Sequence, residues 1–490
     1  MITLRDVSFG FPGVAAGDFF DSLSLTIADG EWVAIAGGNG SGKTTLCRLM
    51  AGLYSPKSGT VSVDGADPAR AHGGDYCGTI PPGHMPGDPR TVPEVGIAFQ
   101  NPDSQFVTST VAREIRFGME NLGFGAGELE SRTASAARTF RLDRYLGRNP
   151  HTISGGEKQR LLLACLWSMG PRHLILDEPF SFLDEEGRAS FLEALQRSFR
   201  SEGKTIIWST IDRDEVALAD RVIFVDKGKI LFDGSPQGMA ASLPENLLDS
   251  SLVHRAAESV STRGESKRGM STGSASLIEM HDASFSPGGD DFMLEVPSFS
   301  AASGERIGIC GPSGSGKTTL LQGCAGLLPP RKGAVTIFGK RVSSRRDFPA
   351  GRIGYLFQTP EEGFFAPTVR EEVALAHRNF VGAAGEDATV VRALGEVGLE
   401  PGTYLGRNPF HLSQGEKRLV ALASVLVLDA EVFMFDEPTM FLDGASRRRL
   451  RAALERIESR GASCIIASHD GPFLEAFAGR VATLERGKLV

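Results

Sequence analysis

The sequence has few cysteines and no long apolar run. Its six cysteines, among 490 residues, show no C-x-x-C spacing and mostly lie inside apolar stretches. We therefore expect reduced core residues in a cytosolic protein, and no disulfide framework. The longest apolar run, around residues 161–169, has half the length of a membrane-spanning helix. The first residues, MITLRDVSFGF, include an early acidic residue and no apolar core, so we expect no secretion signal.

A surplus of positive charge is also missing. The chain has 52 Lys and Arg against 60 Asp and Glu, a net charge of −8. Because phosphate backbones are held by an excess of Lys and Arg, we expect no nucleic-acid partner. Hydrophobic residues at 41% and charged residues at 23% are typical of soluble globular proteins, and the length is sufficient for two or three domains.

Four sequence landmarks occur twice in the same order, which predicts two homologous domains. The pairs are GGNGSGKTTL (37–46) with GPSGSGKTTL (311–320), AFQNPDSQF (98–106) with LFQTPEEGF (356–364), ISGGEKQR (153–160) with LSQGEKRL (412–419), and LILDEP (174–179) with FMFDEP (433–438). The first pair is separated by 274 residues and the others by 258 or 259, so the first half carries an insertion. Its place is 72–93, which is rich in Gly and Pro and is predicted to be a surface loop. His72, Cys77 and His84 within it match no metal-ligand spacing.

Apolar β-branched runs alternate with helical patterns in both halves, which predicts a mainly parallel α/β sheet in each. The expected strands are 32–36, 173–176, 205–208, 306–310, 432–435 and 464–467. We expect a first domain at 1–235, a helical tail and linker at 236–276, and a second domain at 277–490. The Ser/Gly-rich segment 258–275 is predicted to be the flexible part of the linker.

The motif G-x-x-x-x-G-K-[ST] occurs twice, each time after an expected strand and before an expected helix. One copy covers 37–44 with Lys43, and the other covers 311–318 with Lys317. Such glycines let backbone N–H groups wrap a chain of phosphates at a helix N-terminus. The lysine then reaches the β- and γ-phosphates, and the final threonine hydroxyl binds Mg²⁺. We predict two phosphate-binding sites of this kind.

An expected strand ending in Asp-Glu-Pro also occurs twice. Asp177 and Asp436 are predicted to hold Mg²⁺, and Glu178 and Glu437 to polarise an attacking water molecule. An Asp-Glu pair after a strand is often only the start of a loop. Here both pairs are followed by Pro and, at identical spacing, by Leu-Asp at 183–184 and 442–443.

The segments ISGGE and LSQGE complete a resemblance to the ATP-binding cassette (ABC) ATPases that covers nearly the whole chain twice. By themselves, a serine and glycines that open a helix indicate only an anion site or a helix cap. The resemblance implies two tandem P-loop NTPase (ABC ATPase) domains of the α/β class. Each would have a mainly parallel sheet core, an antiparallel β subdomain and a helical subdomain. It also implies ATP and Mg²⁺ as cofactors, and intramolecular pairing of the two cassettes head to tail.

Site residues follow from the resemblance, motif by motif. In the head-to-tail arrangement, the first signature closes over ATP on Lys317 and the second over ATP on Lys43. Gln100 and Gln358 match the family's glutamine that contacts Mg²⁺, His469 matches its switch histidine, and Phe11 matches the aromatic residue that stacks on adenine. The implied ATP contacts are Gly37, Gly38, Asn39, Gly40, Ser41, Gly42, Lys43, Thr44, Thr45, Gly311, Pro312, Ser313, Gly314, Ser315, Gly316, Lys317, Thr318, Thr319, Ser154, Gly155, Gly156, Ser413 and Gly415, and the Mg²⁺ ligands are Thr44, Gln100, Asp177, Thr318, Gln358 and Asp436.

The two implied sites are unequal. In the second half, Pro287 stands where Phe11 stands in the first. Ile211, or Thr210 with a one-residue slip, takes the place of His469, and Gln414 replaces a small signature residue. The changes at Ile211 and Gln414 both affect the site built on Lys43, because the second signature closes over that site. We therefore predict that the site on Lys317 carries hydrolysis.

The segments after the two glutamines resemble the A components of energy-coupling factor (ECF) importers of vitamins and transition-metal ions. That resemblance implies a transmembrane T-type coupling subunit and a substrate-binding membrane subunit as partners, at the cytoplasmic face of the cell membrane. Asp103 and Glu361 or Glu362 would meet basic residues of the T-type subunit, although a solvated acidic helix start also explains them. Two alternatives remain open: a tandem-cassette translation factor that acts on ribosomes, and a fused ATPase of a sugar or peptide importer.

Overall fold

The chain forms two compact units, Met1–Val253 and His254–Val490, and each has its own core. The computed structural model describes residues 1–11, 19–71, 94–253, 276–287, 293–382 and 385–490. The insertion at 72–93, with His72, Cys77 and His84, and the linker at 258–275 lie outside the described residues. Among the described helices, none combines the length and the apolar character needed to cross a bilayer.

The first unit contains two sheets and a set of helices. Its strands are β1 (Ile2–Phe9), β2 (Phe20–Ile27), β3 (Trp32–Ala36), β4 (Ser58–Val63), β5 (Val95–Ala98), β6 (His173–Asp177), β7 (Thr205–Thr210), β8 (Arg221–Asp226) and β9 (Lys229–Gly234). Its helices are α1 (Lys43–Met50), α2 (Pro68–Ala71), α3 (Val111–Asn121), α4 (Ala126–Thr139), α5 (Gly155–Met169), α6 (Glu185–Ser198), α7 (Arg213–Val216), α8 (Pro236–Ser242) and α9 (Glu245–Ser251).

The central sheet has the strand order β5-β6-β7-β3-β8-β9. All neighbouring pairs are parallel except β8 and β9. Strands β3, β6 and β7 are buried along their whole length, as expected for central strands covered on both faces. A smaller antiparallel sheet has the order β2-β1-β4.

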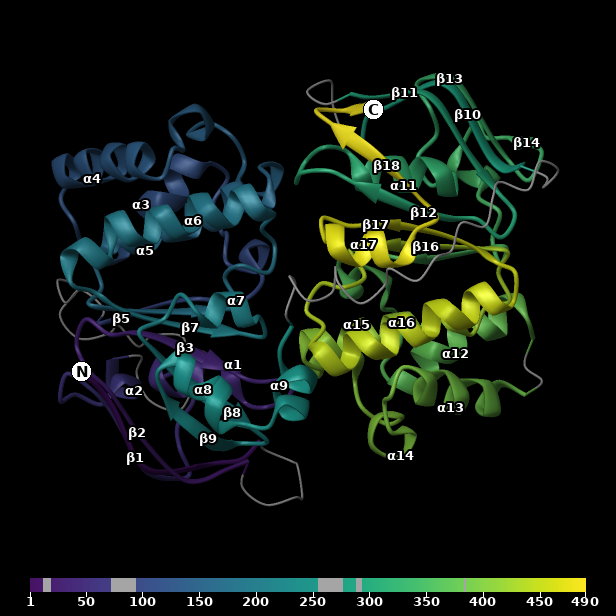
Figure 1. Cartoon of the computed structure of the whole chain (residues 1–490). Coiled ribbons are helices and arrows are strands. Elements are labelled where there is room, and N and C mark those ends of the chain that lie inside the picture. The colour runs from purple at the N-terminus through teal and green to yellow at the C-terminus, as the bar shows by residue number, and fades with distance from the viewer. Residues whose placement is uncertain (12–18, 72–93, 254–275, 288–292, 383–384) are drawn as a thin grey trace. The chain divides into compact units, whose positions relative to one another are not determined.

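Side chains of β3 alternate between two apolar cores, because successive residues of a strand point to opposite faces. Trp32 and Ala34 belong to the core that the sheet forms with α3, α5 and α6, while Val33 and Ile35 belong to the core shared with α1 and the antiparallel sheet. Figure 1 shows α3, α5 and α6 on one side of β3, β5 and β7, and β1 and β2 on the other. Met239 of α8 and Leu248 of α9 join the first of these cores.

The second unit repeats this plan. Its strands are β10 (Ser276–Phe285), β11 (Leu294–Ala302), β12 (Arg306–Cys310), β13 (Lys332–Ile337), β14 (Lys340–Arg341), β15 (Ile353–Leu356), β16 (Val432–Asp436), β17 (Ser463–Ala467), β18 (Arg480–Glu485) and β19 (Lys488–Leu489). Its helices are α11 (Lys317–Ala325), α12 (Val369–Phe380), α13 (Glu386–Glu396), α14 (Pro401–Tyr404), α15 (Gln414–Leu426), α16 (Gly444–Ser459) and α17 (Gly471–Phe477).

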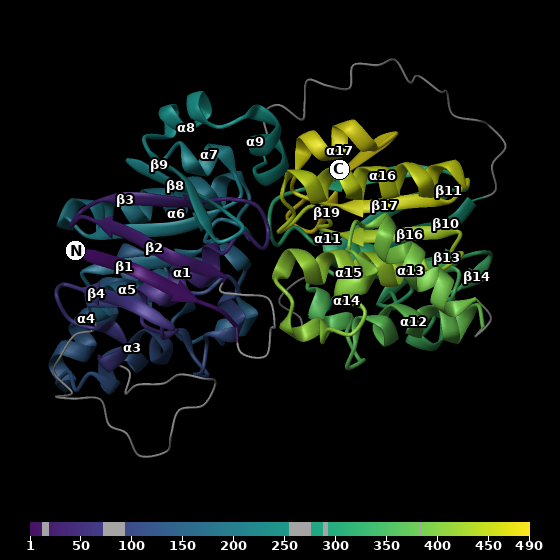
Figure 2. The ribbon, with the colours of Figure 1, turned by 90° about the horizontal axis from the view of Figure 1, so that it is seen from below.

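The strands of the second unit form one continuous sheet in the order β14-β13-β10-β11-β19-β18-β12-β17-β16-β15. The segment from β18 to β15 is parallel, and the segment from β14 to β11 is antiparallel. Helices α12, α13, α14 and α15 gather beside the parallel segment (Figure 2). The predicted fold class, with a parallel core, an antiparallel β part and a helical part in each half, is therefore confirmed.

Candidate functional site

The two glycine-rich loops each connect a central strand to a helix, β3 to α1 and β12 to α11. The first residue of each loop, Gly37 or Gly311, has a φ of about 155°. A Cβ atom on Gly37 would lie 2.1 Å from the carbonyl oxygen of Val225, and one on Gly311 would lie 2.4 Å from that of Leu484. Only glycine fits there, because both the backbone conformation and the close approach of a neighbouring strand exclude a side chain.

The lysine of each loop lies inside it and is buried. Lys43 Nζ donates to the carbonyl oxygens of Gly37 and Gly38 at 2.9 and 3.0 Å, and Lys317 Nζ donates to those of Gly311 and Pro312 at 2.8 and 3.2 Å. The buried hydroxyls of Ser41 and Ser315 have no hydrogen-bond partner within the described part of the chain. A buried ammonium, unpartnered hydroxyls and a helix N-terminus together form a donor set suited to phosphate oxygens.

A carboxylate at the end of a parallel strand faces the threonine of each loop. Thr44 Oγ1 donates to Asp177 Oδ1 at 3.1 Å. In the second unit, burial raises the pKa of Asp436 to about 7, although a hydrogen bond with Thr318 opposes the rise. Asp436 Oδ1 has no hydrogen-bond partner among the described residues. A buried carboxylate oxygen without a hydrogen-bond partner suits a hard cation such as Mg²⁺, which prefers oxygen ligands.

The two glutamates predicted to act on water have the same backbone conformation and a loop lysine nearby, Lys43 Nζ at 3.9 Å from Glu178 and Lys317 Nζ at 3.6 Å from Glu437, and they differ in their other neighbours. Glu178 and Glu437 both adopt the left-handed conformation, with φ of 46° and 47°. Glu178 Oε2 accepts a hydrogen bond from Gln100 Nε2 at 2.7 Å, and burial raises the pKa of Glu178. The sequence assigned Gln100 and Glu178 to the same site, and the structure brings these two side chains together.

Glu437 is bound by a histidine instead. His469 Nδ1 lies 2.9 Å from Glu437 Oε2, Ser468 Oγ donates to the same oxygen at 2.9 Å, and Lys317 Nζ lies 3.6 Å from Oε1. Burial would raise the pKa of Glu437, but the charge and hydrogen bond of His469 outweigh it and lower the pKa to about 2. The second unit therefore holds this carboxylate ionised, as a general base requires.

Strand register identifies the residue of the first unit that corresponds to His469. Asp177 pairs with Ser209 between β6 and β7, and Asp436 pairs with Ala467 between β16 and β17. Counting two residues onward from each partner leads to Ile211 and to His469. Of the two alternatives that the sequence left open, the register therefore supports Ile211 and not Thr210.

The signature segments act as helix caps. Ser154 caps α5 and Ser413 caps α15, each through a reciprocal capping box with Glu157 or Glu416. Gln414 stands in the first turn of α15 where α5 has Gly155. The Leu-Asp pairs also have a local role, since Asp184 caps α6 and Asp443 caps α16.

Two tyrosines near the signatures escaped the sequence analysis. Tyr145 Oη donates to Glu157, and Tyr404 Oη donates to Glu416 at 2.6 Å. Burial and the neighbouring carboxylate raise the pKa of both tyrosines. The available signal was their identical separation of 12 residues from the glutamate in the two halves.

The remaining predicted site residues differ between the units. Phe11 is 40% exposed, and its ring packs edge-on against those of Phe9, Phe19 and Tyr54, with the Phe9 centroid 5.2 Å away. Pro287 is exposed at the corresponding place. Gln358 follows Phe357, whose carbonyl oxygen accepts a hydrogen bond from Arg418.

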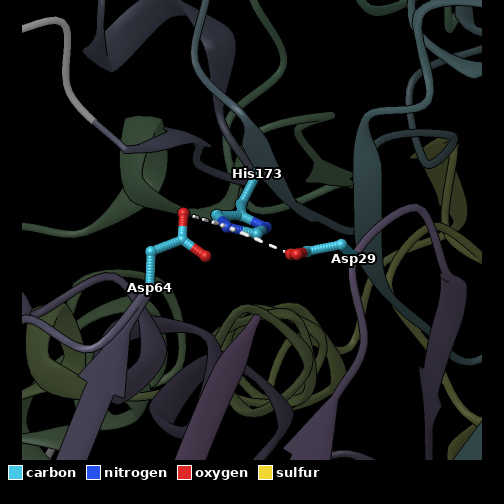
Figure 3. Close-up of side chains that lie close together, drawn as sticks. All are labelled: Asp29, Asp64 and His173. Atoms are coloured by element: carbon cyan, nitrogen blue, oxygen red, sulfur yellow. Dashed lines mark hydrogen bonds and ion pairs between the residues drawn. The ribbon is translucent and has the colours of Figure 1, made fainter.

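A separate cluster lies at the opposite end of β6 from Asp177. His173 Nε2 is 3.1 Å from Asp64 Oδ2 and 4.0 Å from Asp29 Oδ1, and Figure 3 shows the ring between the two carboxylates. The amino group of Met1 binds both aspartates. The cluster lies at the far end of β6 from the phosphate loop, so we assign it no role in nucleotide chemistry.

Comparisons with known proteins show which proteins this chain is similar to. A family model described as ABC transporter matches residues 20–181 and 294–440. A Bifidobacterium longum (strain NCC 2705) protein assigned as an ABC transporter ATP-binding protein is 31% identical, over 98% of this chain and 64% of its own length. A Bacillus subtilis (strain 168) protein assigned to HMP/thiamine import as the ATP-binding protein is 27% identical, over 99% of this chain and 90% of its own length.

Among solved structures, the model of ribosome-bound archaeal Pelota and ABCE1 contains a similar chain. Its TM-score is 0.65 at 22% identity, over 99% of this chain and 78% of that one. At this identity the likeness shows the shared fold alone.

Proposed function

The chain belongs to the ABC transporter family, and from this we propose that it binds two ATP molecules and couples their hydrolysis to a separate membrane importer. The duplicated loop, with Lys43 and Asp177 in one unit and Lys317 and Asp436 in the other, supports two Mg-ATP sites. Bound Mg²⁺ would neutralise charge on the phosphates. Glu437 would take the proton of the attacking water, with His469 holding its side chain.

The main support for a membrane partner is an apolar groove in the second unit. It has a volume of about 390 Å³ and lies between β15, the segment after it, α12 and α15. Phe357, Phe364, Phe365 and Phe380 line it, and Phe365 is 77% exposed. Exposed apolar surface of this kind marks an interaction site. Since Gln358 directly follows Phe357, a helix seated in the groove would press on the loop that carries this glutamine.

Asp103 has a smaller part in docking than its sequence suggests. Its carboxylate is bound within the first unit by Lys158 Nζ at 2.7 Å and by His151 Nδ1 at 3.1 Å. A basic residue of a partner would therefore compete with two internal cations. We assign docking to the groove, and Asp103 to the attachment of the loop after Gln100 to the helix α5.

The proposed cargo class follows from the resemblance to ECF-type A components and from the relative assigned to HMP/thiamine import. We propose uptake of a vitamin or a transition-metal ion through a T-type coupling subunit and a substrate-binding membrane subunit. The chain would act at the cytoplasmic face of the membrane. The ribosomal alternative is supported by the fold that this chain shares with a chain of the ribosome-bound archaeal Pelota and ABCE1 model.

Fractionation of cells that express the chain tests this function. Phe365→Ser should remove most of the membrane-bound fraction without changing ATP affinity, because the residue lies outside the phosphate loop. Val391→Ser is the matched control, since Val391 is 44% exposed on α13 and does not line the groove. A Phe365→Cys variant with a crosslinker should attach to an integral membrane protein. Sedimentation with ribosomes, unaffected by Phe365→Ser, would support the translation-factor alternative instead.

A further inference from the structure

A buried arginine in the second unit takes no part in the chemistry described above. Arg418 lies on α15, one turn after the cap residue Ser413, and is 1% exposed. A guanidinium is costly to bury unless hydrogen bonds satisfy it. Its partners should therefore show why the fold keeps a charge at this position.

Arg418 binds two backbone carbonyl groups from different segments. Its Nη1 donates to the carbonyl oxygen of Phe357 at 2.6 Å, and its Nη2 donates to that of Glu437 at 2.5 Å. Phe357 precedes Gln358, and Glu437 holds the left-handed conformation at the end of β16. One planar side chain thus joins the signature helix, the glutamine loop and the residue assigned as general base.

The described part of the first unit shows no such connection. Gln159 occupies the corresponding position, five residues after its own cap residue Ser154. Gln159 is 2% exposed, and its Nε2 makes no hydrogen bond with any residue that the structure describes. The bridge therefore belongs to the unit in which His469 contacts Glu437.

We propose that Arg418 is a positioning residue that fixes Glu437 and the glutamine loop against helix α15. It acts through the two carbonyl groups. Glu178 has the same left-handed backbone without such a bridge, so we assign the bridge to the attachment of the Glu437 carbonyl group and the glutamine loop to α15, and not to the φ of Glu437. The catalytic part of this inference rests on the proposed role of Glu437, and the structural part does not.

The test compares Arg418→Gln, which copies the first unit, with Arg418→Lys and with the control Gln159→Leu, all in the full chain. Amide hydrogen exchange should accelerate about tenfold at 357–360 and 437–440 in Arg418→Gln, since two buried carbonyl groups lose their donors. Exchange at 99–105 should not change. The kcat for ATP should fall about tenfold, while KM changes by less than about twofold. Arg418→Lys should fall between wild type and Arg418→Gln, and Gln159→Leu should leave both measurements unchanged.

Unchanged exchange at both segments in Arg418→Gln would overturn the proposal, and so would a rise in KM at constant kcat. Faster exchange with activity insensitive to both Arg418→Gln and Glu437→Gln would refute the role of Glu437 and leave the bridge established. If Arg418→Gln does not fold, Arg418→Lys provides the same two readouts, with exchange about threefold faster as the expected result and wild-type exchange as the contradiction.

Discussion

Glu178 and Glu437 occupy the same place in two copies of one fold, and their neighbours set opposite proton affinities. Burial raises the pKa of Glu178, whereas His469 lowers that of Glu437 to about 2. What makes Glu437 the better candidate for the base is that His469 and Ser468 hold its carboxylate in place. Ile211, which stands in the place of His469, has no polar group to offer Glu178.

At this scale we expect Glu437→Gln to abolish nearly all ATPase activity and Glu178→Gln to leave a substantial fraction. Loss of one preorganised polar group at a transition state typically costs about 10²–10³ in rate, and the site on Lys43 already lacks the histidine. Steady-state ATPase assays of the two variants check this. Counting the ATP cleaved in a single turnover should give one fast equivalent per chain.

Equal losses from the two substitutions would contradict the inequality in a steady-state assay. Coupled sites produce the same pattern when closure requires both nucleotides to be hydrolysable, and the single-turnover count separates the two cases. Two fast equivalents per chain would refute the assignment of hydrolysis to the Lys317 site.

At the scale of an element, strand β6 carries charged groups at both ends with different tasks. Asp177 at its C-terminal end meets Thr44 of the phosphate loop, where ligands of parallel sheets bind. His173 at its N-terminal end is 1% exposed and bound to Asp64. The second unit has Val432 at the place of His173, so the fold does not require a histidine there.

The cluster at His173 predicts a stability that depends on pH. Burial lowers the pKa of His173, and the Met1 amino group and His173 outweigh burial to lower that of Asp64 to about 2. A group whose pKa falls on folding stabilises the native state above its unfolded pKa and loses that contribution on acidification. The melting temperature of the first unit should therefore fall as the pH drops below about 6.5, through His173, and again below about 4, through Asp64.

His173→Val isolates the first of these steps. Calorimetry at pH 7 and pH 5 should show a smaller decrease in melting temperature for this variant than for wild type. Asp64→Asn should be less stable than wild type at pH 7 by about 1 kcal/mol, since it removes a charged hydrogen-bond acceptor. The same pH dependence in wild type and His173→Val would refute the role of the histidine.

At the scale of the whole molecule, two units with separate cores are joined in one polypeptide. If they pair to form the ATP sites, the covalent connection raises the effective concentration of one unit for the other to the order of millimolar. Pairing would then not depend on protein concentration. A cut between 253 and 276 would make it depend on concentration.

We therefore expect the ATPase activity per molecule of the intact chain to be constant between about 0.1 and 10 µM. The same chain cut at an engineered protease site in 258–275 should lose activity on dilution, because association becomes bimolecular. Uncut chain that carries the engineered site is the control. Activity of the cut protein that stays constant on dilution would show that each unit works alone.

Much of the fold and part of the site could be predicted from the sequence alone. The repeated landmarks establish two copies, and fully buried strands such as β3 and β16 appear as unbroken apolar runs because both faces are covered. The phosphate loops are also local, since their glycines and lysine act within eight consecutive residues on one strand and one helix.

Only the tertiary structure decided what surrounds these local motifs. The hydrogen bond of Gln100 with Glu178 spans 78 residues, and the bridge from Arg418 to Phe357 spans 61. Strand register was needed to identify Ile211 as the residue of the first unit that corresponds to His469. The groove lined by Phe365 likewise combines segments from β15 to α15. A sequence pattern reports which residues share a strand or helix face, whereas pKa values, bridges and grooves depend on which faces the folded chain brings together.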